Sequence, residues 1–162
     1  MKDFTDFEII SGGAERLDSV KLLWEELRDY HAEHSTHFGD QMRAVSFEFR
    51  RSRFELYAAN DCLLIELIWH GPSATNVAFS ASTIEIEEGL RWGCLESLYV
   101  IPGFRQQELG SLLTRRSIDW MKSQKCDRIV LSVAEGNEPV FNFYRRFGFQ
   151  IRHSAMQLIE EK

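Results

Sequence analysis

The residues that first suggest chemistry lie in one stretch, residues 95–111. An apolar, strand-like run over residues 95–100 is broken by a Pro-Gly pair, and a turn from Arg105 to Gly110 then opens into a helical pattern. The first N–H groups of a helix have no partner within it, and the helix dipole is positive at that end. A strand, a tight loop and a helix N-terminus in this order predict an anion site.

Two further polar residues follow this stretch. Asn137 comes after the apolar run 128–133, and Tyr144 lies among aromatic residues in the segment FNFYRRFGF. Taken alone, Tyr144 beside Phe141 and Phe147 is typical of core packing, and Asn137 is typical of a helix N-cap. A functional role for either residue therefore needs support from the other motifs.

The first half of the chain predicts helices that flank a sheet. Apolar residues recur at helical spacing over residues 14–34, and a second helix begins after Ser46, a good N-cap, and extends to residue 58. A short strand over residues 7–10 precedes these helices, and residues 35–45 are expected to form a loop. The spacing of apolar residues then changes from that of helices to that of strands, and three strands are predicted over residues 62–69, 76–86 and 92–100. Short turns separate them, which favours an antiparallel meander.

The second half predicts a crossover connection. A helix separates strand 92–100 from strand 128–133, and its length suits a right-handed β-α-β unit, so these two strands should be parallel. A last helix over residues 138–147, with Gly148 as a left-handed C-cap, and a strand over residues 149–159 complete the chain. The order predicts one α/β domain over residues 1–162, of the α+β type with a mixed sheet. In this sheet an antiparallel meander is followed by a splayed parallel pair.

Composition limits the classes of function. The chain has 162 residues, of which 44% are hydrophobic, as expected of a globular domain. A net charge of −6 argues against nucleic acid as the main partner and suits an amine-bearing small ligand. Three widely spaced cysteines indicate a reducing compartment. Because no signal or membrane-spanning pattern is present, we expect a cytoplasmic protein with no membrane association.

In order, these motifs resemble the GNAT superfamily of acetyl-CoA-dependent N-acetyltransferases. The resemblance rests on Leu98-Tyr99-Val100-x-Pro102, on Arg105 and Gly110, on Asn137 after Val133, and on the run that begins at Tyr144. It covers residues 95–149, and the element order fits nearly the whole chain. The resemblance implies a GNAT-like acyl-CoA N-acyltransferase fold, acetyl-CoA as acetyl donor without a metal, and direct attack by a primary amine of a small acceptor.

The resemblance also implies a role for each matching residue. The backbone of Leu98, Tyr99 and Val100 would pair with the pantetheine arm like an added strand. Asn137 would hydrogen-bond that arm, and Tyr144 would protonate the leaving thiolate. The pyrophosphate would lie against the loop formed by Arg105, Gln106, Gln107, Glu108, Leu109, Gly110 and Ser111.

Glu108 departs from the family pattern, which has glycine at this position. A side chain there can hinder the approach of the pyrophosphate, and a carboxylate adds negative charge beside phosphates. Alternatively, Glu108 points to solvent while its backbone N–H still faces the cofactor. The departure leaves a second hypothesis open, a non-catalytic acyl-CoA-binding or sensing module with the same fold.

Acetyl transfer to an amine requires that the amine lose a proton. With a lysine-like pKa, only about one amine in 10³ is uncharged at pH 7, so a general base helps. Glu96, on the same strand and just before an expected bulge, is the predicted base, although an ordinary paired strand residue would look the same.

Three histidines near the end of the first long helix suggest a metal site at first sight. His37 lies beyond the predicted helix end and no cysteine is near, so we expect no metal. The resemblance instead places the acceptor pocket in this region, where the predicted substrate-binding residues are Tyr30, His31, His34 and Phe38. The last predicted strand could pair across subunits, which leaves a homodimer open.

Overall fold

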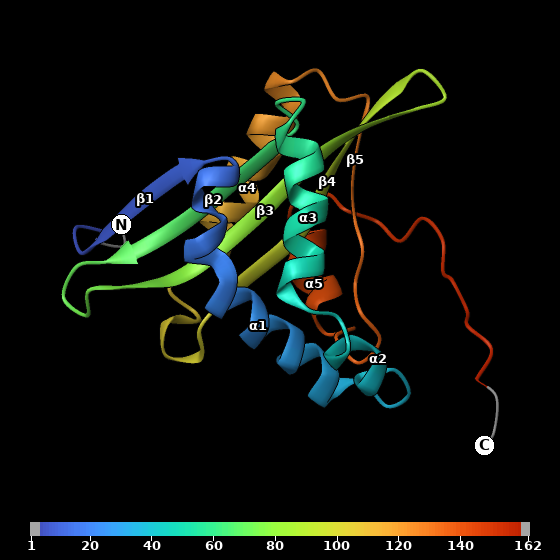
Figure 1. The fold of residues 1–162 in the computed structure, drawn as a ribbon, viewed down its shortest axis with the longest axis horizontal. Helices are drawn as coiled ribbons and strands as arrows, with labels where there is room; N and C mark the ends of the chain where they lie inside the picture. The colour runs from blue at the N-terminus through green and yellow to red at the C-terminus, as the bar shows by residue number, and fades with distance from the viewer. Residues whose placement is uncertain (1–3, 160–162) are drawn as a thin grey trace.

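The computed structural model describes residues 4–159 and contains a five-stranded sheet in the order β1-β2-β3-β4-β5 (Figure 1). Neighbouring strands are antiparallel from β1 to β4, and β5 is parallel to β4. Both features of the predicted mixed sheet are confirmed. The strands are β1 (Phe7–Gly12), β2 (Leu63–His70), β3 (Thr75–Glu87), β4 (Leu90–Val100) and β5 (Arg128–Leu131).

Helices cover both faces of the sheet. Figure 1 shows α1 (Leu17–His34) and α3 (Phe47–Ala58) in front of the strands and α4 (Leu109–Ser123) behind them. The apolar stripe of α1 is buried, which produces one core cluster with α3, and Leu109 and Leu113 of α4 form a second cluster on the opposite face. The shorter elements are η1 (Ala14–Arg16), α2 (Gly39–Arg43), η2 (Pro102–Phe104) and α5 (Val140–Arg145).

Several local predictions are confirmed and three are wrong. The Ser46 hydroxyl accepts a hydrogen bond from Phe49 N at 3.1 Å, as an N-cap should, and Gly148 has a φ of 93°. The expected loop over residues 35–45 contains the short helix α2. Asn137 does not cap α5, because the N-cap position is held by Pro139.

The predicted strand over residues 149–159 is the third error. The structure assigns no strand to these residues, and residues 150–159 are exposed throughout. A strand needs a partner for its backbone groups, and this segment pairs with no strand of its own chain among residues 4–159. Within those same residues, no helix has the length and apolar character needed to cross a bilayer.

A bulge in β4 opens the sheet. The pairing of β3 with β4 shifts between Ala81 and Ser82, so that Glu96 is the extra residue on β4. Pairing between β4 and β5 stops at Leu95, opposite Leu131. Beyond this point β4 continues to Val100 with no strand on its β5 side among the described residues.

An ion pair between a buried carboxylate and a partly exposed arginine fixes α4 to the sheet. Glu66 of β2 is 1% exposed, and its Oε1 accepts hydrogen bonds from Arg116 Nε at 2.8 Å and Nη2 at 2.6 Å. Ser11 of β1 donates a further hydrogen bond to the same oxygen at 2.9 Å. Three elements that are distant in sequence therefore meet at one carboxylate.

We predict that Arg116→Ala lowers the free energy of unfolding by about 2–3 kcal/mol, because the buried Glu66 carboxylate loses its cation. Chemical denaturation measures this loss. Lys122→Ala removes an exposed cation from the same helix and should change stability by less than about 0.5 kcal/mol. Equal losses in the two variants would contradict the role given to the ion pair.

Candidate active site

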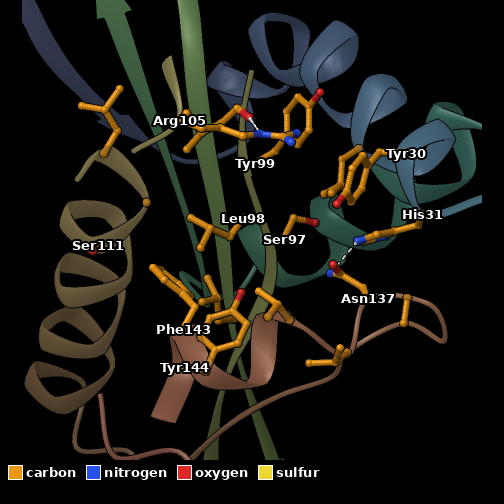
Figure 2. A pocket seen from close by; sticks show the side chains of 18 of the residues that line it. Tyr30, His31, Ser97, Leu98, Tyr99, Arg105, Ser111, Asn137, Phe143 and Tyr144 are labelled. Carbon is orange, nitrogen blue, oxygen red and sulfur yellow. Dashed lines mark hydrogen bonds between the residues drawn. The ribbon is translucent and has the colours of Figure 1, made fainter. Parts of the chain in front are cut away.

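A cleft of about 430 Å³ lies where β4 and β5 separate. Figure 2 shows α4 on one side of this cleft, α1 on the other and β4 between them. The cleft is also lined by residues 132–134, which follow β5, and by residues of α5. The predicted site residues that line it are Tyr30, His31, Glu96, Leu98, Tyr99, Val100, Arg105, Gln106, Glu108, Leu109, Gly110, Ser111, Asn137 and Tyr144.

Backbone conformation shapes the loop before α4. Gln106 and Glu108 have φ values of 62° and 66°, in the left-handed region that favours glycine. Glu108 is the N-cap of α4 without a side-chain capping bond, and the first-turn residues Leu109, Gly110 and Ser111 line the cleft. The preference for glycine at this position is therefore conformational as well as steric.

Gly110 leaves space for a ligand in the same loop. A Cβ atom built there would lie 3.6 Å from Phe143 Cζ and 3.8 Å from Val100 Cγ2, which are ordinary contacts. The packing of the chain itself therefore does not require glycine at this position. A ligand backed against the helix N-terminus would use the free space, so the residues present fit a pyrophosphate.

The carboxylate of Glu108 has a cationic partner. Its Oε2 lies 3.5 Å from Arg146 Nη2, and Arg146 also donates a hydrogen bond to Ser111 Oγ at 3.3 Å. Both charged side chains are about half exposed, so the attraction between them is modest. The Arg146 guanidinium nevertheless offsets part of the negative charge that Glu108 brings to the loop.

Tyr144 reaches the cleft from α5. Figure 2 shows its hydroxyl directed toward Leu98 of β4. Burial raises the pKa of Tyr144 to about 12, so the phenol keeps its proton at any physiological pH. Edge-to-face contacts with Phe143 and Phe149 hold the ring in place.

His31 and Asn137 meet on the α1 side of the cleft. Asn137 Nδ2 lies 3.5 Å from His31 Nε2 (Figure 2). Burial, and secondarily the neighbouring His34, lowers the pKa of His31. The imidazole is therefore neutral at pH 7 and can accept a proton or a hydrogen bond.

The loop that carries Asn137 is fastened to the end of α1. The Glu135 carboxylate accepts hydrogen bonds from the Ser35 hydroxyl and from Thr36 N, the latter at 3.0 and 3.1 Å. Gly136 has a φ of 87°, and a Cβ there would lie 2.0 Å from the carbonyl oxygen of His34. Only glycine fits at this contact.

Glu96 lines the cleft from the β4 bulge. Its Oε1 accepts a hydrogen bond from Thr83 Oγ1 at 3.1 Å, and its Oε2 lies 3.6 Å from Arg50 Nη1 of α3. The carboxylate is thus positioned by β3 and α3 and retains lone pairs for another donor.

Three predicted residues do not line the cleft: Gln107, His34 and Phe38. His34 stacks on Tyr30 at 4.1 Å between ring centroids, and the Arg105 guanidinium lies 5.1 Å from the centroid of Tyr30. His34 therefore packs against a residue that lines the cleft without lining it itself. No group of three or more His, Cys, Asp or Glu residues within residues 4–159 is arranged to hold a metal ion.

Sequence reasoning missed several lining residues, above all Arg146. It lies two residues after Tyr144, inside the run that resembles the family motif, where the resemblance assigns a role to Tyr144 alone. The other unpredicted lining residues are mostly apolar or small, and their side chains carry no signal in sequence: Leu27, Leu95, Ser97, Phe104, Ser132, Val133, Ala134, Val140 and Phe143.

Comparison with known proteins agrees with this geometry. Residues 22–149 match the model of the acetyltransferase (GNAT) family. A curated relative, N-alpha-acetyltransferase 30 from Schizosaccharomyces pombe, is 35% identical over 57 residues, which span 35% of this chain and 38% of that protein.

Solved structures share the fold at low sequence identity. A mutant protein from Bacillus halodurans superposes with a TM-score of 0.75 at 18% identity, covering 95% of this chain and 99% of that one. Glucosamine-6-phosphate N-acetyltransferase from Arabidopsis thaliana superposes with a TM-score of 0.66 at 20% identity, covering 96% of this chain and 99% of that one. An aminoglycoside N-acetyltransferase in complex with CoA superposes with a TM-score of 0.67 at 15% identity, covering 96% of this chain and 95% of that one.

The fold agrees with the family match. The chain belongs to the acetyltransferase (GNAT) family, whose members use acetyl-CoA as a cosubstrate.

We predict that Glu108→Gly lowers the Kd for acetyl-CoA about threefold to tenfold, because it removes a negative charge and a side chain beside the phosphates. Isothermal titration calorimetry measures the change. Glu88→Gly is the matched control, since Glu88 also has a positive φ, 51°, but lies in the exposed turn between β3 and β4. An unchanged Kd in Glu108→Gly would show that Arg146 and the local backbone already accommodate the carboxylate.

Proposed function

We propose that the protein transfers the acetyl group of acetyl-CoA to a primary amine of a small acceptor by direct attack, without a covalent enzyme intermediate. The observation that carries the proposal is the meeting of three features in one cleft. They are the open N-terminus of α4, the unpaired edge of β4 and the hydroxyl of Tyr144.

The cleft offers a place for each part of the cosubstrate. The first-turn N–H groups of α4, with Arg146 beside them, suit the pyrophosphate. The edge of β4 from Leu98 to Val100 has no neighbouring strand on its β5 side among residues 4–159 and suits the amide groups of the pantetheine arm, which would pair with it as an extra strand. At the end of this edge, the Val100 carbonyl oxygen already accepts a hydrogen bond from Arg105 Nε at 3.0 Å. Asn137 lies across the cleft and would donate a further hydrogen bond to that arm.

The chemical step needs a donor for each developing negative charge. Acetyl-CoA supplies the thioester, and unpaired N–H groups of β4 near the bulge stabilise the oxyanion that forms when the amine attacks. Tyr144, which stays protonated because its pKa is about 12, donates its proton to the leaving thiolate and regains one from the nitrogen that becomes the amide.

Glu96 is the proposed base for the acceptor ammonium. Its carboxylate lies on the α1 and α3 side of β4, where it both attracts a cation and accepts its proton. His31 is the second candidate, because it is neutral at pH 7 and lines the same side of the cleft. The two assignments predict different pH profiles.

A small acceptor suits the size of this cleft, much of which the cosubstrate would occupy. Two of the solved structures named above are a glucosamine-6-phosphate N-acetyltransferase and an aminoglycoside N-acetyltransferase, whereas the curated sequence relative is an N-alpha-acetyltransferase. We propose a small cationic amine, and a peptide N-terminus is the competing acceptor class.

Free-CoA release against a panel of small amines and peptides tests the proposal, and Tyr144→Phe tests the mechanism. With the best acceptor, Tyr144→Phe should lower kcat by at least about 10²-fold and leave the Kd for acetyl-CoA within about twofold. Tyr57→Phe is the matched control, since the pKa of Tyr57 is also raised to about 12 but its hydroxyl donates to Glu85, outside the cleft. Equal kcat values in wild type and Tyr144→Phe would remove Tyr144 from the mechanism.

Glu96→Gln should lower kcat/KM by about 10²-fold or more at pH 7, and the deficit should shrink as the pH approaches the amine pKa of about 10. The reason is that free amine becomes abundant there and needs no base. If His31 is the base instead, the acid limb of the profile lies below pH 6.5, because the pKa of His31 is lowered. This limb would then persist in Glu96→Gln and disappear in His31→Asn.

A further inference from the structure

The hydrogen bond between His31 and Asn137 can run in only one direction. Asn137 Nδ2 is an amide nitrogen, which donates and cannot accept, and it lies 3.5 Å from His31 Nε2 (Figure 2). His31 Nε2 is therefore the acceptor, which requires a neutral ring with its proton on Nδ1. Burial, and secondarily His34, lowers the pKa of His31, so this neutral form is the one present at pH 7.

The backbone holds these two side chains opposite each other. The loop before Asn137 is fastened to the end of α1, since Glu135 accepts a hydrogen bond from the Ser35 hydroxyl and Gly136 packs against the carbonyl group of His34. Asn137 itself is held by backbone hydrogen bonds at both its N–H and its C=O group, each 3.0 Å long. Repulsion between the two side chains therefore cannot be relieved by separating the backbones.

We propose that His31 is a positioning residue for acetyl-CoA, because it fixes which end of the Asn137 amide faces the arm of the cosubstrate. This role rests on the proposed function, in which Asn137 donates a hydrogen bond to the pantetheine arm. The amide nitrogen carries two hydrogens, so Nδ2 donates one to His31 and the other to a carbonyl group of the arm. Without His31 as acceptor, rotation about the last side-chain bond of Asn137 would exchange its oxygen and nitrogen at little cost.

Protonation of His31 reverses this arrangement. An imidazolium has a hydrogen on each ring nitrogen, so Nε2 becomes a donor that faces a second donor, Asn137 Nδ2. Rotation of the amide removes the conflict, since Oδ1 then accepts from His31, but the arm loses its donor. Acetyl-CoA therefore binds more weakly as the pH falls through the lowered pKa of His31. By linkage, bound acetyl-CoA lowers that pKa further.

The charged groups around His31 do not favour its protonated form. Glu96 is engaged by Thr83 and Arg50, and Glu135 by residues 35 and 36. Of the titratable or charged groups on the surrounding elements, only His34 contributes to the shift in the pKa of His31. Those groups are Tyr30 and His34 on α1, His37 after it, Asp40 and Arg43 on α2, Arg50 on α3, Glu96 and Tyr99 on β4, Arg105 before α4, Glu135 and Glu138 after β5, and Tyr144 on α5.

The same hydrogen bond bears on the choice of general base. The Nε2 lone pair of His31 is engaged by Asn137, and Nδ1 already carries the proton of the neutral ring. Neither ring nitrogen is then available to take a proton from the acceptor amine. This leaves Glu96 as the base, with His31 acting on the affinity for acetyl-CoA.

Calorimetry of acetyl-CoA binding between about pH 5 and pH 8 tests the inference. As the pH falls over this range, the Kd of the wild type should rise about tenfold relative to that of His31→Gln. The glutamine oxygen of this variant accepts from Asn137 at every pH, so the two proteins should bind equally at the upper end. Phosphate groups of the cosubstrate titrate in both proteins, and the comparison removes their effect.

Two further variants separate positioning from other effects. His34→Gln is the matched control, since His34 does not line the cleft, and it should keep the pH dependence of the wild type. Asn137→Ala should weaken binding and abolish the difference between His31 and His31→Gln. If the His31 imidazolium merely attracted the phosphates, the wild type would bind more tightly at low pH than His31→Gln, which is the opposite sign and would overturn the inference.

NMR of the free protein tests the contact without the cosubstrate. Imidazole ¹⁵N shifts should place the proton of neutral His31 on Nδ1, and the side-chain amide signals of Asn137 should titrate together with the His31 ring. A neutral ring with its proton on Nε2 would contradict the inference. Equal pH dependence of the Kd in wild type and His31→Gln overturns the inference alone, whereas no acetyl-CoA binding at any pH overturns the proposed function as well.

Discussion

The site depends on one interruption in the sheet. Pairing between β4 and β5 ends at Leu95, next to the bulge at Glu96, and beyond it β4 pairs with no strand on that side among residues 4–159. At Val100 the carbonyl oxygen accepts a hydrogen bond from Arg105 Nε at 3.0 Å. Backbone N–H and C=O groups along a strand edge favour a ligand that can pair with them, because such groups are costly to bury without a partner. The bulge also directs Glu96 toward Thr83 and Arg50. One extra residue therefore both opens the binding edge and positions a candidate acid–base group.

The electrostatics of the cleft are arranged around this opening. On the α4 side, the helix N-terminus and Arg146 present positive charge, and Glu108 is paired with Arg146. On the α1 side, Glu96 supplies a carboxylate and His31 a neutral imidazole. An anionic cosubstrate and a cationic acceptor would thus each meet complementary charge. The net charge of −6, which is spread over the whole chain, does not describe the loop that would hold phosphates.

Local patterns predicted most of the fold, and long-range contacts explain the failures. The stripe from Leu17 to Leu27 and the Ser46 cap depend on neighbours in sequence, and both were predicted. Asn137 was expected to cap α5, but its partner is His31, more than a hundred residues away. His34 was placed in the pocket because helical spacing cannot tell a lining residue from one that supports it. The strand expected over residues 149–159 has suitable residues but finds no partner within its own chain among residues 4–159.

The contact between Glu135, Gly136 and the end of α1 bears on how the protein is made. Glu135 binds Ser35 across 100 positions of sequence, and Gly136 packs on the carbonyl group of His34. During synthesis, α1 leaves the ribosome about a hundred residues before this loop does, so Tyr30 and His31 stay without their opposite wall until residues 135–137 have been made. The cleft is therefore a late product of folding. A nascent chain that stops before residue 135 can form most of the sheet and still lack the wall that carries Asn137.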